Sequence, residues 1–311
     1  MPSSIDIGTV RNRSYCILAL VALVTHSSPA ATQEKAQDAN LRGWTAFYAG
    51  SSNYAGTGGD LNASRYGVSF GSDMEFAESW LAGGSISIGK QHFTVPDSSG
   101  DSDDLFLGLY AHKTFLGNGY VIGSGLLGWH DVTTSRRAGP EQLQGKVTAR
   151  ELGGHIEAGY RLWLDSTYSA APFFALGAET IHTPAYGEVP LSGLGLFARN
   201  YATYDSYIAH TELGVRIGRS FDISEHKLWV ETTLGWAHEL DDTPLSQTVF
   251  PGFGGTGFAL NTILPARETA LLGLNLQAQK DRGVSYGARF DSQVGGNTTV
   301  LSGTANIAWR W

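Results

Sequence analysis

The sequence contains only one cysteine, Cys16, in 311 residues. A single cysteine excludes an intrachain disulfide framework, and it cannot supply the several thiolates of a cysteine-based metal site. Charge is scarce too, because charged residues make up 16% of the chain against roughly 25% in soluble domains. The formal net charge of -8 argues against nucleic acid as a partner, since phosphate backbones bind basic surfaces.

Long hydrophobic runs are missing as well. The longest, CILALVALV at residues 16–24, is far shorter than the roughly 20 apolar residues that a transmembrane helix needs. Two arginines precede this run and small residues ending at Ala30 follow it, which is the pattern of a secretory signal peptide. We therefore predict that residues 1–30 form a signal peptide, cleaved near Ala30, and that the exported chain has no cysteine.

Glycine and aromatic residues are plentiful instead. The chain has 40 glycines and 11% aromatic residues, yet its mean hydropathy is only -0.12. This composition suits strands that are apolar on one face only. From Trp44 to the C-terminus the hydrophobic pattern has a period of two, which predicts β-strands. Twelve strands are expected, at residues 43–50, 64–71, 79–92, 104–113, 119–132, 147–162, 171–182, 203–218, 227–239, 267–278, 283–291 and 299–311.

The predicted strands and their connections match a membrane barrel better than a soluble sheet. Strands of about 9–14 residues exceed the usual length and suit a tilted strand that crosses a bilayer. Their connections alternate in length. Long loops are expected at 51–63, 93–103, 133–146, 183–202 and 240–266. Short turns are expected at 114–118, 163–170, 219–226 and 279–282.

Long loops on one rim and short turns on the other are the layout of outer-membrane barrels. We therefore expect an all-β fold, a transmembrane antiparallel β-barrel of twelve strands in the outer membrane of a Gram-negative bacterium. An even number of strands puts both chain ends on the short-turn, periplasmic rim. It also lets the last strand pair with the first, so that no strand edge is left unpaired in lipid.

The second half of the chain carries motifs that resemble a known family. Five segments resemble the autotransporter barrel in its usual order: LGGHIEAGYRL (152–162), ELGVRIGRSF (212–221), LGWAHEL (234–240), RETALLGLNLQAQ (267–279) and GVSYGARFD (283–291). The resemblance implies a translocator barrel, here residues 43–311, through which an N-terminal passenger reaches the cell surface. It also implies a short linker helix inside the barrel. Residues 31–42 (ATQEKAQDANLR) favour helix and are placed to form that helix.

The final strand resembles the signal by which outer-membrane barrels are recognised for assembly. Ile307, Trp309 and Trp311 share one face, and the chain ends on an aromatic residue. The expected partners are the barrel assembly machinery, outer-membrane lipid with lipopolysaccharide, and a passenger polypeptide. Because only residues 31–42 separate the predicted cleavage site from the first strand, we expect no passenger in this chain. That leaves a degenerate family member, a truncated gene model or a barrel that serves a separate polypeptide.

Charged residues on the strands form the main candidate site. Eight lie on the predicted inner face: Glu151, Glu157, Arg161, Glu212, Arg216, Glu231, Arg289 and Arg310. An Arg or Lys facing lipid at mid-bilayer would cost about 2–4 kcal/mol, so these residues must face water, one another or an inserted segment. One interpretation is a hydrated passage whose charges hold the linker helix. The other is a structural lattice of ion pairs that closes a narrow barrel, and both predict the same residues.

Other motifs in the sequence are assigned to structure and not to chemistry. Residues 123–128 match GxGxxG, and residues 67–71 and 283–287 match G-x-S-x-G, but none precedes the helix that these motifs require. Acidic clusters are expected in solvated loops, at Asp101, Asp103 and Asp104 and at Asp241 and Asp242 beside His238 and Glu239. The histidines lack close metal-ligand spacing. We therefore expect no catalytic residue, no cofactor and no metal.

Three functions remain open at this point. The first is an autotransporter-type translocator that provides a polar conduit. The alternative is a standalone barrel acting as a pore or as a binding or structural protein through its loops, especially 183–202 and 240–266. The third is a barrel hydrolase that uses loop residues such as His238 and Asp241. We favour the translocator and do not expect an enzyme.

Overall fold

The computed structural model describes residues 41–56, 59–76, 79–115, 117–223, 226–240, 246–251, 258–261, 265–280 and 283–310. Within these ranges no helix is both long and apolar enough to cross a membrane. The predicted signal peptide, Asp241, Asp242 and Trp311 lie outside the described residues, as does the linker helix up to residue 40. The last two residues assigned to that helix, Leu41 and Arg42, lie in the first strand.

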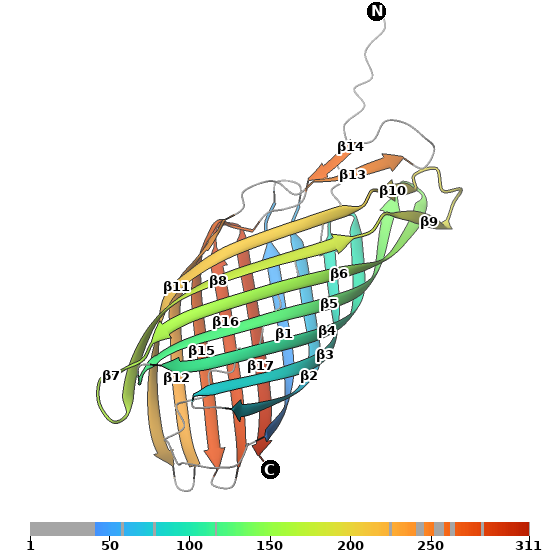
Figure 1. Cartoon of the computed structure of the whole chain (residues 1–311). Helices are drawn as coiled ribbons and strands as arrows, with labels where there is room; N and C mark the ends of the chain where they lie inside the picture. The colour runs from blue at the N-terminus through green and yellow to red at the C-terminus, as the bar shows by residue number, and fades with distance from the viewer. Residues whose placement is uncertain are drawn as a thin grey trace, which may run out of the picture.

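Twelve long strands, of 12 to 20 residues each, form the wall of the barrel (Figure 1). They are β1 (Leu41–Tyr54), β2 (Leu61–Phe76), β3 (Trp80–Val95), β4 (Ser98–Phe115), β5 (Gly119–Ala138), β6 (Glu141–Tyr160), β8 (Tyr168–Thr183), β11 (Tyr204–Ile223), β12 (His226–Glu239), β15 (Glu268–Lys280), β16 (Val284–Gly295) and β17 (Thr298–Arg310). Each is antiparallel to its neighbours, and β1 pairs with β17 from Arg42 opposite Arg310 to Tyr54 opposite Thr298. The predicted all-β fold of twelve antiparallel strands, closed first to last, is confirmed.

The two rims of the barrel differ in their connections. The start of β1 and the C-terminus lie on one rim, the turn rim (Figure 1), together with the connections 77–79, 116–118, 161–167, 224–225 and 281–283. The other rim, the loop rim, carries the connections 55–60, 96–97, 139–140, 184–203, 240–267 and 296–297. Two of the predicted long loops are therefore wrong, because residues 93–103 and 133–146 are almost entirely strand.

These strands continue past the apolar band, and both of their faces then carry polar residues. The alternation that marks a lipid-facing strand fades there, so the sequence pattern ends before the strand does. Asp101 and Asp103, which fall in the predicted loop 93–103, consequently lie in β4 together with Asp104. The β5–β6 hairpin turns within two residues, where Gly139 has a φ of 56°, a conformation that glycine adopts without strain.

Short strands extend the wall at both rims. At the loop rim β9 (Tyr186–Ser192) pairs with β6 and β10 (Arg199–Tyr201), while β13 (Ser246–Pro251) joins β10 to β14 (Phe258–Asn261). Arg136 of β5 fixes this sheet through two bonds to the Glu188 carboxylate, of 2.8 and 2.5 Å. The long loop-rim connections therefore contain ordered sheet structure.

The carboxylate of Asp165 stabilises the turn between β6 and β8. β7 (Leu162–Trp163) pairs there with the start of β8. The Asp165 carboxylate accepts the backbone N–H groups of Thr167 and Tyr168 at 2.6 and 2.7 Å, and these bonds lower the pKa of Asp165. A local hydrogen-bonded turn thus connects two strands without a long loop.

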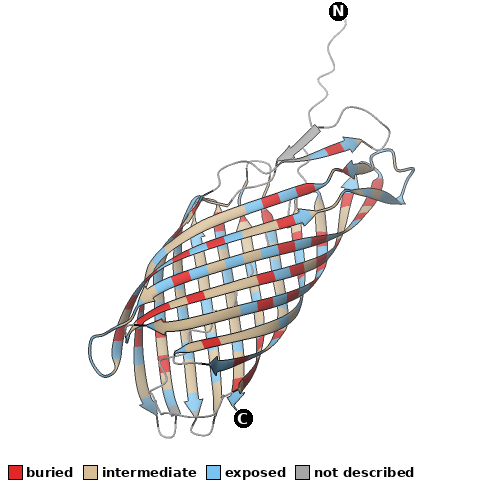
Figure 2. Cartoon of the chain, in the orientation of Figure 1, coloured by how far each residue is buried: buried red, intermediate tan, exposed pale blue. Residues whose placement is uncertain are grey.

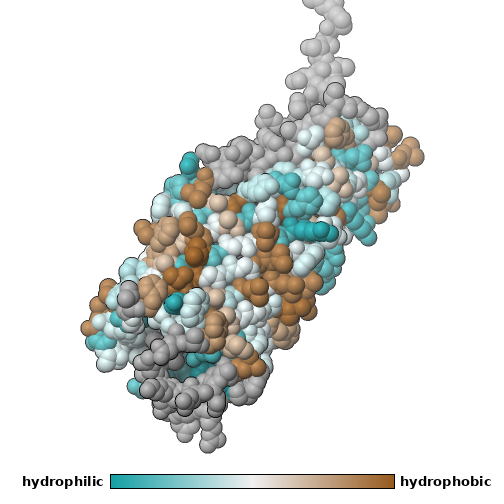
Figure 3. Space-filling model, viewed as in Figure 1, coloured by the Kyte–Doolittle hydropathy of each residue, from teal (hydrophilic) through white to brown (hydrophobic). Residues whose placement is uncertain are grey.

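The outward faces of the strands form an apolar band. On β4 the exposed side chains Leu105, Leu107 and Leu109 follow one another at every second position. Exposed and buried residues alternate along many strands (Figure 2), and brown apolar patches cover much of the visible wall (Figure 3). Near the turn rim, cations lie over aromatic rings, with Lys113 Nζ 4.8 Å from the Trp80 ring and the Arg219 guanidinium 4.5 Å from the Tyr168 ring. Such aromatic and basic residues mark a membrane–water boundary.

Inside the barrel, large aromatic side chains lie across glycines of neighbouring strands. A Cβ atom on Gly71 would lie 2.2 Å from the Trp44 ring, and one on Gly159 would lie 2.4 Å from the Tyr120 hydroxyl. These glycines leave room for the aromatic groups to lie flat against the wall. Much of the high glycine content therefore serves close packing on the inner face.

Replacing Gly159 with alanine is expected to destabilise the barrel. The added methyl group would meet Tyr120, whose hydroxyl is held by Glu157 and Arg216. We expect a loss of about 1–3 kcal/mol, measured as a lower urea midpoint by heat-modifiable gel migration. Gly154→Ala on the same strand is the control, because its Cβ would meet only ordinary van der Waals contacts. Equal losses in the two variants would contradict this account.

Candidate functional site: the polar lumen

The predicted inner-face charges are distributed along the lumen from the turn rim upward. Four of them are buried: Glu151, Glu157, Arg216 and Glu231. The other four, Arg161, Glu212, Arg289 and Arg310, are partly or more fully exposed. Each of the eight lies close to an acidic or basic partner. The partners of Glu212 and Arg289 lie on their own strands, whereas the partners of the other six lie elsewhere in the chain.

The tightest cluster joins β5, β6 and β11. Arg216 binds both oxygens of the Glu157 carboxylate, with 2.7 Å from Nη2 to Oε2, and donates to the Tyr120 hydroxyl at 2.8 Å. The Tyr120 hydroxyl in turn donates to Glu157 Oε1 at 2.9 Å. The intervening strand β8 contributes the small buried residues Ala171 and Ala175 on its inner face. The Arg216 guanidinium lies 4.1 Å from the centre of the Phe173 ring, which is between these two alanines, so the ion pair passes over β8 and ties three strands together.

A second cluster lies closer to the turn rim. Arg161 Nη2 donates to Glu231 Oε2 at 3.0 Å, Nη1 donates to the Ser169 hydroxyl at 3.1 Å, and the guanidinium lies 5.3 Å from the centre of the Trp229 ring. Glu231 and Ser169 are buried. The cluster therefore links the end of β6 to β8 and β12 on the inner face.

Two further clusters were not predicted from the sequence. In the first, Arg42 binds both oxygens of Asp73 at 2.9 and 2.8 Å, and Tyr110 donates to the same carboxylate at 2.7 Å. Trp44 Nε1 donates to the Tyr110 hydroxyl at 2.8 Å. Asp73 was missed because it follows the predicted end of its strand at residue 71. With the ladder extended to Phe76, its alternation would have placed it inside.

The second unpredicted cluster centres on His130. Its Nδ1 lies 2.9 Å from Asp104 Oδ1, and its Nε2 lies 2.9 Å from Glu151 Oε2. The Ser102 hydroxyl donates to Asp104 at 2.5 Å. An imidazole between two carboxylates holds β4, β5 and β6 together in the half of the barrel nearer the loop rim.

The other predicted residues lie apart from these clusters. Glu212 Oε1 lies 3.4 Å from His210 Nε2. Arg289 Nε lies 2.6 Å from Asp291 Oδ2 on its own strand. At the turn rim, Arg310 Nη2 lies 3.7 Å from Glu75 Oε1. Of the predicted assembly signal, Trp309 is exposed and Ile307 is partly exposed on β17. These two therefore lie on the outer wall.

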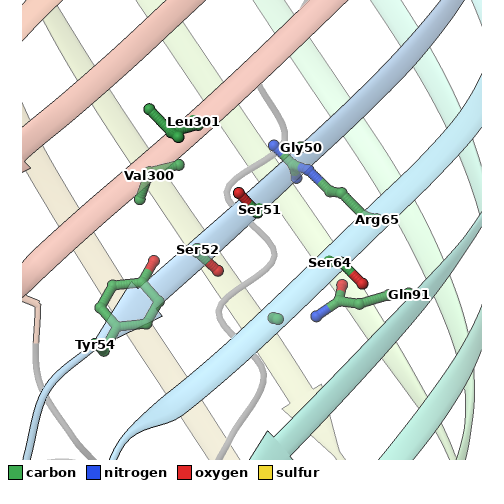
Figure 4. Close-up of a pocket in the computed structure, with 10 residues that line it drawn as sticks. Gly50, Ser51, Ser52, Tyr54, Ser64, Arg65, Gln91, Val300 and Leu301 are labelled. Carbon is green, nitrogen blue, oxygen red and sulfur yellow. The ribbon is translucent and has the colours of Figure 1, made fainter.

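Part of the inner surface is hollow beside β1, β2, β3 and β17. Figure 4 shows Arg65 and Gln91 at one such pocket, with Tyr54 and Ser52 opposite; its free space is about 320 Å³. A larger space of about 880 Å³ also includes Arg65 in its lining. The other residues that line it are Trp44, Tyr48, Ala49, Ser69, Ser85, Ser87, Gln91, Asp104, Phe106, Gly108, Tyr110, Leu126, Ser302, Gly303 and Thr304. Arg65 has no ion pair or hydrogen bond with any residue that the structure describes. The lumen thus offers a free cation beside open space.

Several buried polar atoms on the opposite wall also lack partners. They are Glu151 Oε1 and His155 Nδ1 on β6, Glu179 Oε1 on β8 and Ser124 Oγ on β5. The described residues contain no group of three histidines, cysteines or carboxylates arranged to hold a metal ion. Unpaired donors and acceptors of both signs suit the binding of a polar chain or water better than a fixed ion.

The other sequence motifs lie within strands. Ser69, at the centre of one G-x-S-x-G match, is buried in β2 and lies 2.7 Å from the Ser87 hydroxyl. The GxGxxG match at 123–128 lies inside β5. Of the acidic clusters, Asp103 forms an ion pair with Lys90 of β3, and Asp101 lies 2.8 Å from Nδ1 of His92 on the same strand, whereas His238 Nδ1 lies 2.7 Å from Glu268. None of these positions has the strand-to-helix turn that a nucleophile or a pyrophosphate site needs.

Comparisons with known proteins agree with this architecture. The family described as the autotransporter beta-domain matches residues 43–291. Among solved structures, the translocator domain of NalP from Neisseria meningitidis has a TM-score of 0.70 at 14% identity, covering 88% of each chain. The beta domain of the Bordetella autotransporter BrkA has a TM-score of 0.64 at 17% identity, covering 86% of this chain and 98% of its own.

The transport unit of AIDA-I from Escherichia coli has a TM-score of 0.56 at 12% identity, covering 90% of this chain and 92% of its own. The comparison with curated protein sequences gives no match. At these identities the structural likenesses establish the fold.

Removing one partner of the buried Glu157–Arg216 ion pair is expected to be costly. Glu157→Ala leaves the buried Arg216 cation uncompensated, so we expect a loss of about 3–5 kcal/mol in unfolding free energy. Arg289→Ala removes a half-exposed pair with Asp291 and is expected to cost less than about 1 kcal/mol. Urea titration of the folded barrel in vesicles measures both. A Glu157→Ala loss no larger than that of Arg289→Ala would contradict a stabilising role for the buried pair.

Proposed function

The chain belongs to the autotransporter β-domain family, and from this premise we propose that its barrel acts as a translocator that conducts a passenger polypeptide to the cell surface. The observation that carries the proposal is the polar lumen, in which Arg65, without an ion pair to any residue that the structure describes, lines open space together with the polar side chains Gln91 and Ser87. A polar chain in transit could exchange bonds with such groups, whereas an apolar or fully paired interior would resist it.

The direction of the chain supports the same route. β1 begins at the turn rim, with Leu41 next to the C-terminal end of β17. Any segment that precedes Leu41 and is displayed at the loop rim must pass through the lumen, because the lipid side cannot accept its backbone polar groups. We assign residues 31–40 to the linker within this path. As a helix, the segment would rise about 1.5 Å per residue and so reach only part-way through.

Membership of the family places the barrel in the outer membrane. The turn rim is accordingly assigned to the periplasm and the loop rim to the cell exterior. Residues 1–30 are proposed to act as the export signal with cleavage near Ala30. Ile307 and Trp309 on the outer wall, with Trp311, are proposed as the segment that the barrel assembly machinery reads.

A transport function does not require catalysis, and the described residues offer little for it. Ser69 lies within a regular strand and bonds another hydroxyl, without a histidine base among its hydrogen-bond partners. The inner carboxylates Glu157 and Glu231 are engaged by arginines. We therefore propose that the barrel is a conduit and not a hydrolase.

Surface display tests the translocator proposal. An epitope-tagged reporter is inserted between Ala31 and Thr32, and whole cells are probed with antibody and external protease. We expect the reporter on the surface, with heat-modifiable migration showing a folded barrel. A matched chain that carries the same reporter in the periplasmic turn between Asp165 and Ser166 should not be stained. A reporter kept in the periplasm by a folded barrel would overturn the proposal.

A further inference from the structure

The outer wall changes from apolar to polar at a defined level below the loop rim. On β6 the exposed outward residues Leu152, Ile156 and Tyr160 give way to Arg150, Thr148 and Lys146. The neighbouring strands make the same change, because Asp131 follows Leu127 and Trp129 on β5, and His182 follows Leu176 on β8. This level marks the upper edge of the apolar band, where lipid headgroups lie.

Most charged groups at this edge already have partners on the adjacent strand. Carboxylates lie opposite basic residues in three pairs: Lys90 with Asp103 at 2.8 Å and His92 with Asp101 at 2.8 Å between β3 and β4, and His182 with Asp205 at 2.7 Å between β8 and β11. On the far side His238 pairs with Glu268 at 2.7 Å. Asp131 accepts the Thr148 hydroxyl at 2.6 Å. These acidic groups along the edge therefore each have a hydrogen-bond or ion-pair partner within the wall.

Two basic residues on β6 differ from these pairs. Lys146 and Arg150 are exposed on the outward face, and no carboxylate that the structure describes lies within ion-pair distance of either. They are four residues apart on one strand face, which separates them by about 13 Å. Asp131, the acidic group nearest to them in the ladder, is engaged by Thr148. Neither cation of the patch therefore has an ion-pair partner among the residues that the structure describes.

Apolar wall continues directly below this patch. Arg150 is followed on the same face by Leu152, and Leu127 and Leu176 lie on the strands to either side. All three leucines are at least 42% exposed. In Figure 3 hydrophilic residues gather over the upper part of the front wall, with hydrophobic residues beneath them. A ligand bound here meets positive charge at one end and an aliphatic surface at the other.

We propose that Lys146 and Arg150 form a binding site for the phosphorylated headgroup of an outer-leaflet glycolipid, lipopolysaccharide. The planar guanidinium of Arg150 suits bidentate binding of one phosphate, and the Lys146 ammonium suits a second phosphate as a point charge. The acyl chains lie along the band formed by Leu127, Leu152 and Leu176. The site deepens the expected contact with lipopolysaccharide by naming its residues. It rests on the outer-membrane location and is independent of the translocator function.

A lipid fits this patch better than a free anion. Two exposed cations in water hold an isolated phosphate weakly, because solvent screens each pair to roughly 1 kcal/mol or less. A glycolipid adds the burial of its chains against the band, and the bilayer holds its headgroup at the level of the two cations. The patch also continues a surface that already faces lipid, so no separate docking face is needed.

The test measures how much lipopolysaccharide stays bound to the folded barrel. Full-length mature protein is refolded in detergent with lipopolysaccharide and washed, and the lipid retained per barrel is quantified by native mass spectrometry. We expect the double variant Lys146→Gln and Arg150→Gln to retain at least tenfold less than the unaltered protein. The control double variant Lys113→Gln and Lys227→Gln removes two cations at the turn rim and should retain the normal amount.

Two further arms separate the sources of binding. The unaltered protein should retain lipopolysaccharide whose phosphates have been removed as poorly as the double variant retains intact lipopolysaccharide. A 10-fold excess of inorganic phosphate should displace little of the intact lipid from the unaltered protein. Equal retention by unaltered and Lys146, Arg150 double-variant protein would overturn the proposal, as would equal loss in the control. Efficient displacement by inorganic phosphate would overturn the lipid assignment in favour of a free-anion site.

Heat-modifiable migration confirms that each variant is folded. The reporter display described above, run on the same variant, should be unchanged. The lipid-retention and surface-display experiments therefore test the lipid site and the translocator function separately.

Discussion

Backbone polar groups cannot remain unpaired in hydrocarbon, and the fold of this chain follows from that constraint. An open sheet would leave the edges of β1 and β17 without partners in the lipid, each unpaired group at a cost of several kcal/mol. The ladder between β1 and β17, from Arg42 opposite Arg310 to Tyr54 opposite Thr298, removes both edges. Closure also creates an interior, which gives the strands two faces in different surroundings.

Those two faces explain where the charges lie. On the outer faces of β4 and β6 the middle of each strand is mainly apolar, and basic groups lie at its edges, as with Lys113 below and Arg150 above. On the inner wall, Glu157 and Arg216 are buried yet paired across β8. Ion pairs consequently link strands on the inner wall, and the lumen is polar. Arg65, which has no ion pair with any residue that the structure describes, lies beside the free space that these contacts leave.

The sequence predicted those parts of the fold that lipid contact imposes. All twelve spanning strands were expected, because alternation is strong where one face meets lipid. The ends were not, since beyond the band both faces meet water, and residues 93–103 and 133–146 lost their pattern. The ion-pair partners on the inner wall were not predicted either. Arg216 and Glu157 lie on strands separated by β8, so their meeting depends on strand order and register, which no short motif records.

The closed barrel and its polar lumen both depend on the pairing of β1 with β17 in this register. Ala49 of β1 and Gly303 of β17 lie opposite each other, and a Cβ at Gly303 would meet nothing nearer than 3.9 Å. In a chain that begins at Ala31 and so lacks the single cysteine, Cys16, Ala49→Cys with Gly303→Cys is predicted to form an intramolecular disulfide in the folded barrel, seen as a reducible gel shift. Ala49→Cys with Leu301→Cys, displaced by two residues, should not, because its Cβ atoms are too far apart. Crosslinking of the displaced pair in place of the opposed pair would contradict the register, and crosslinking of neither would contradict closure.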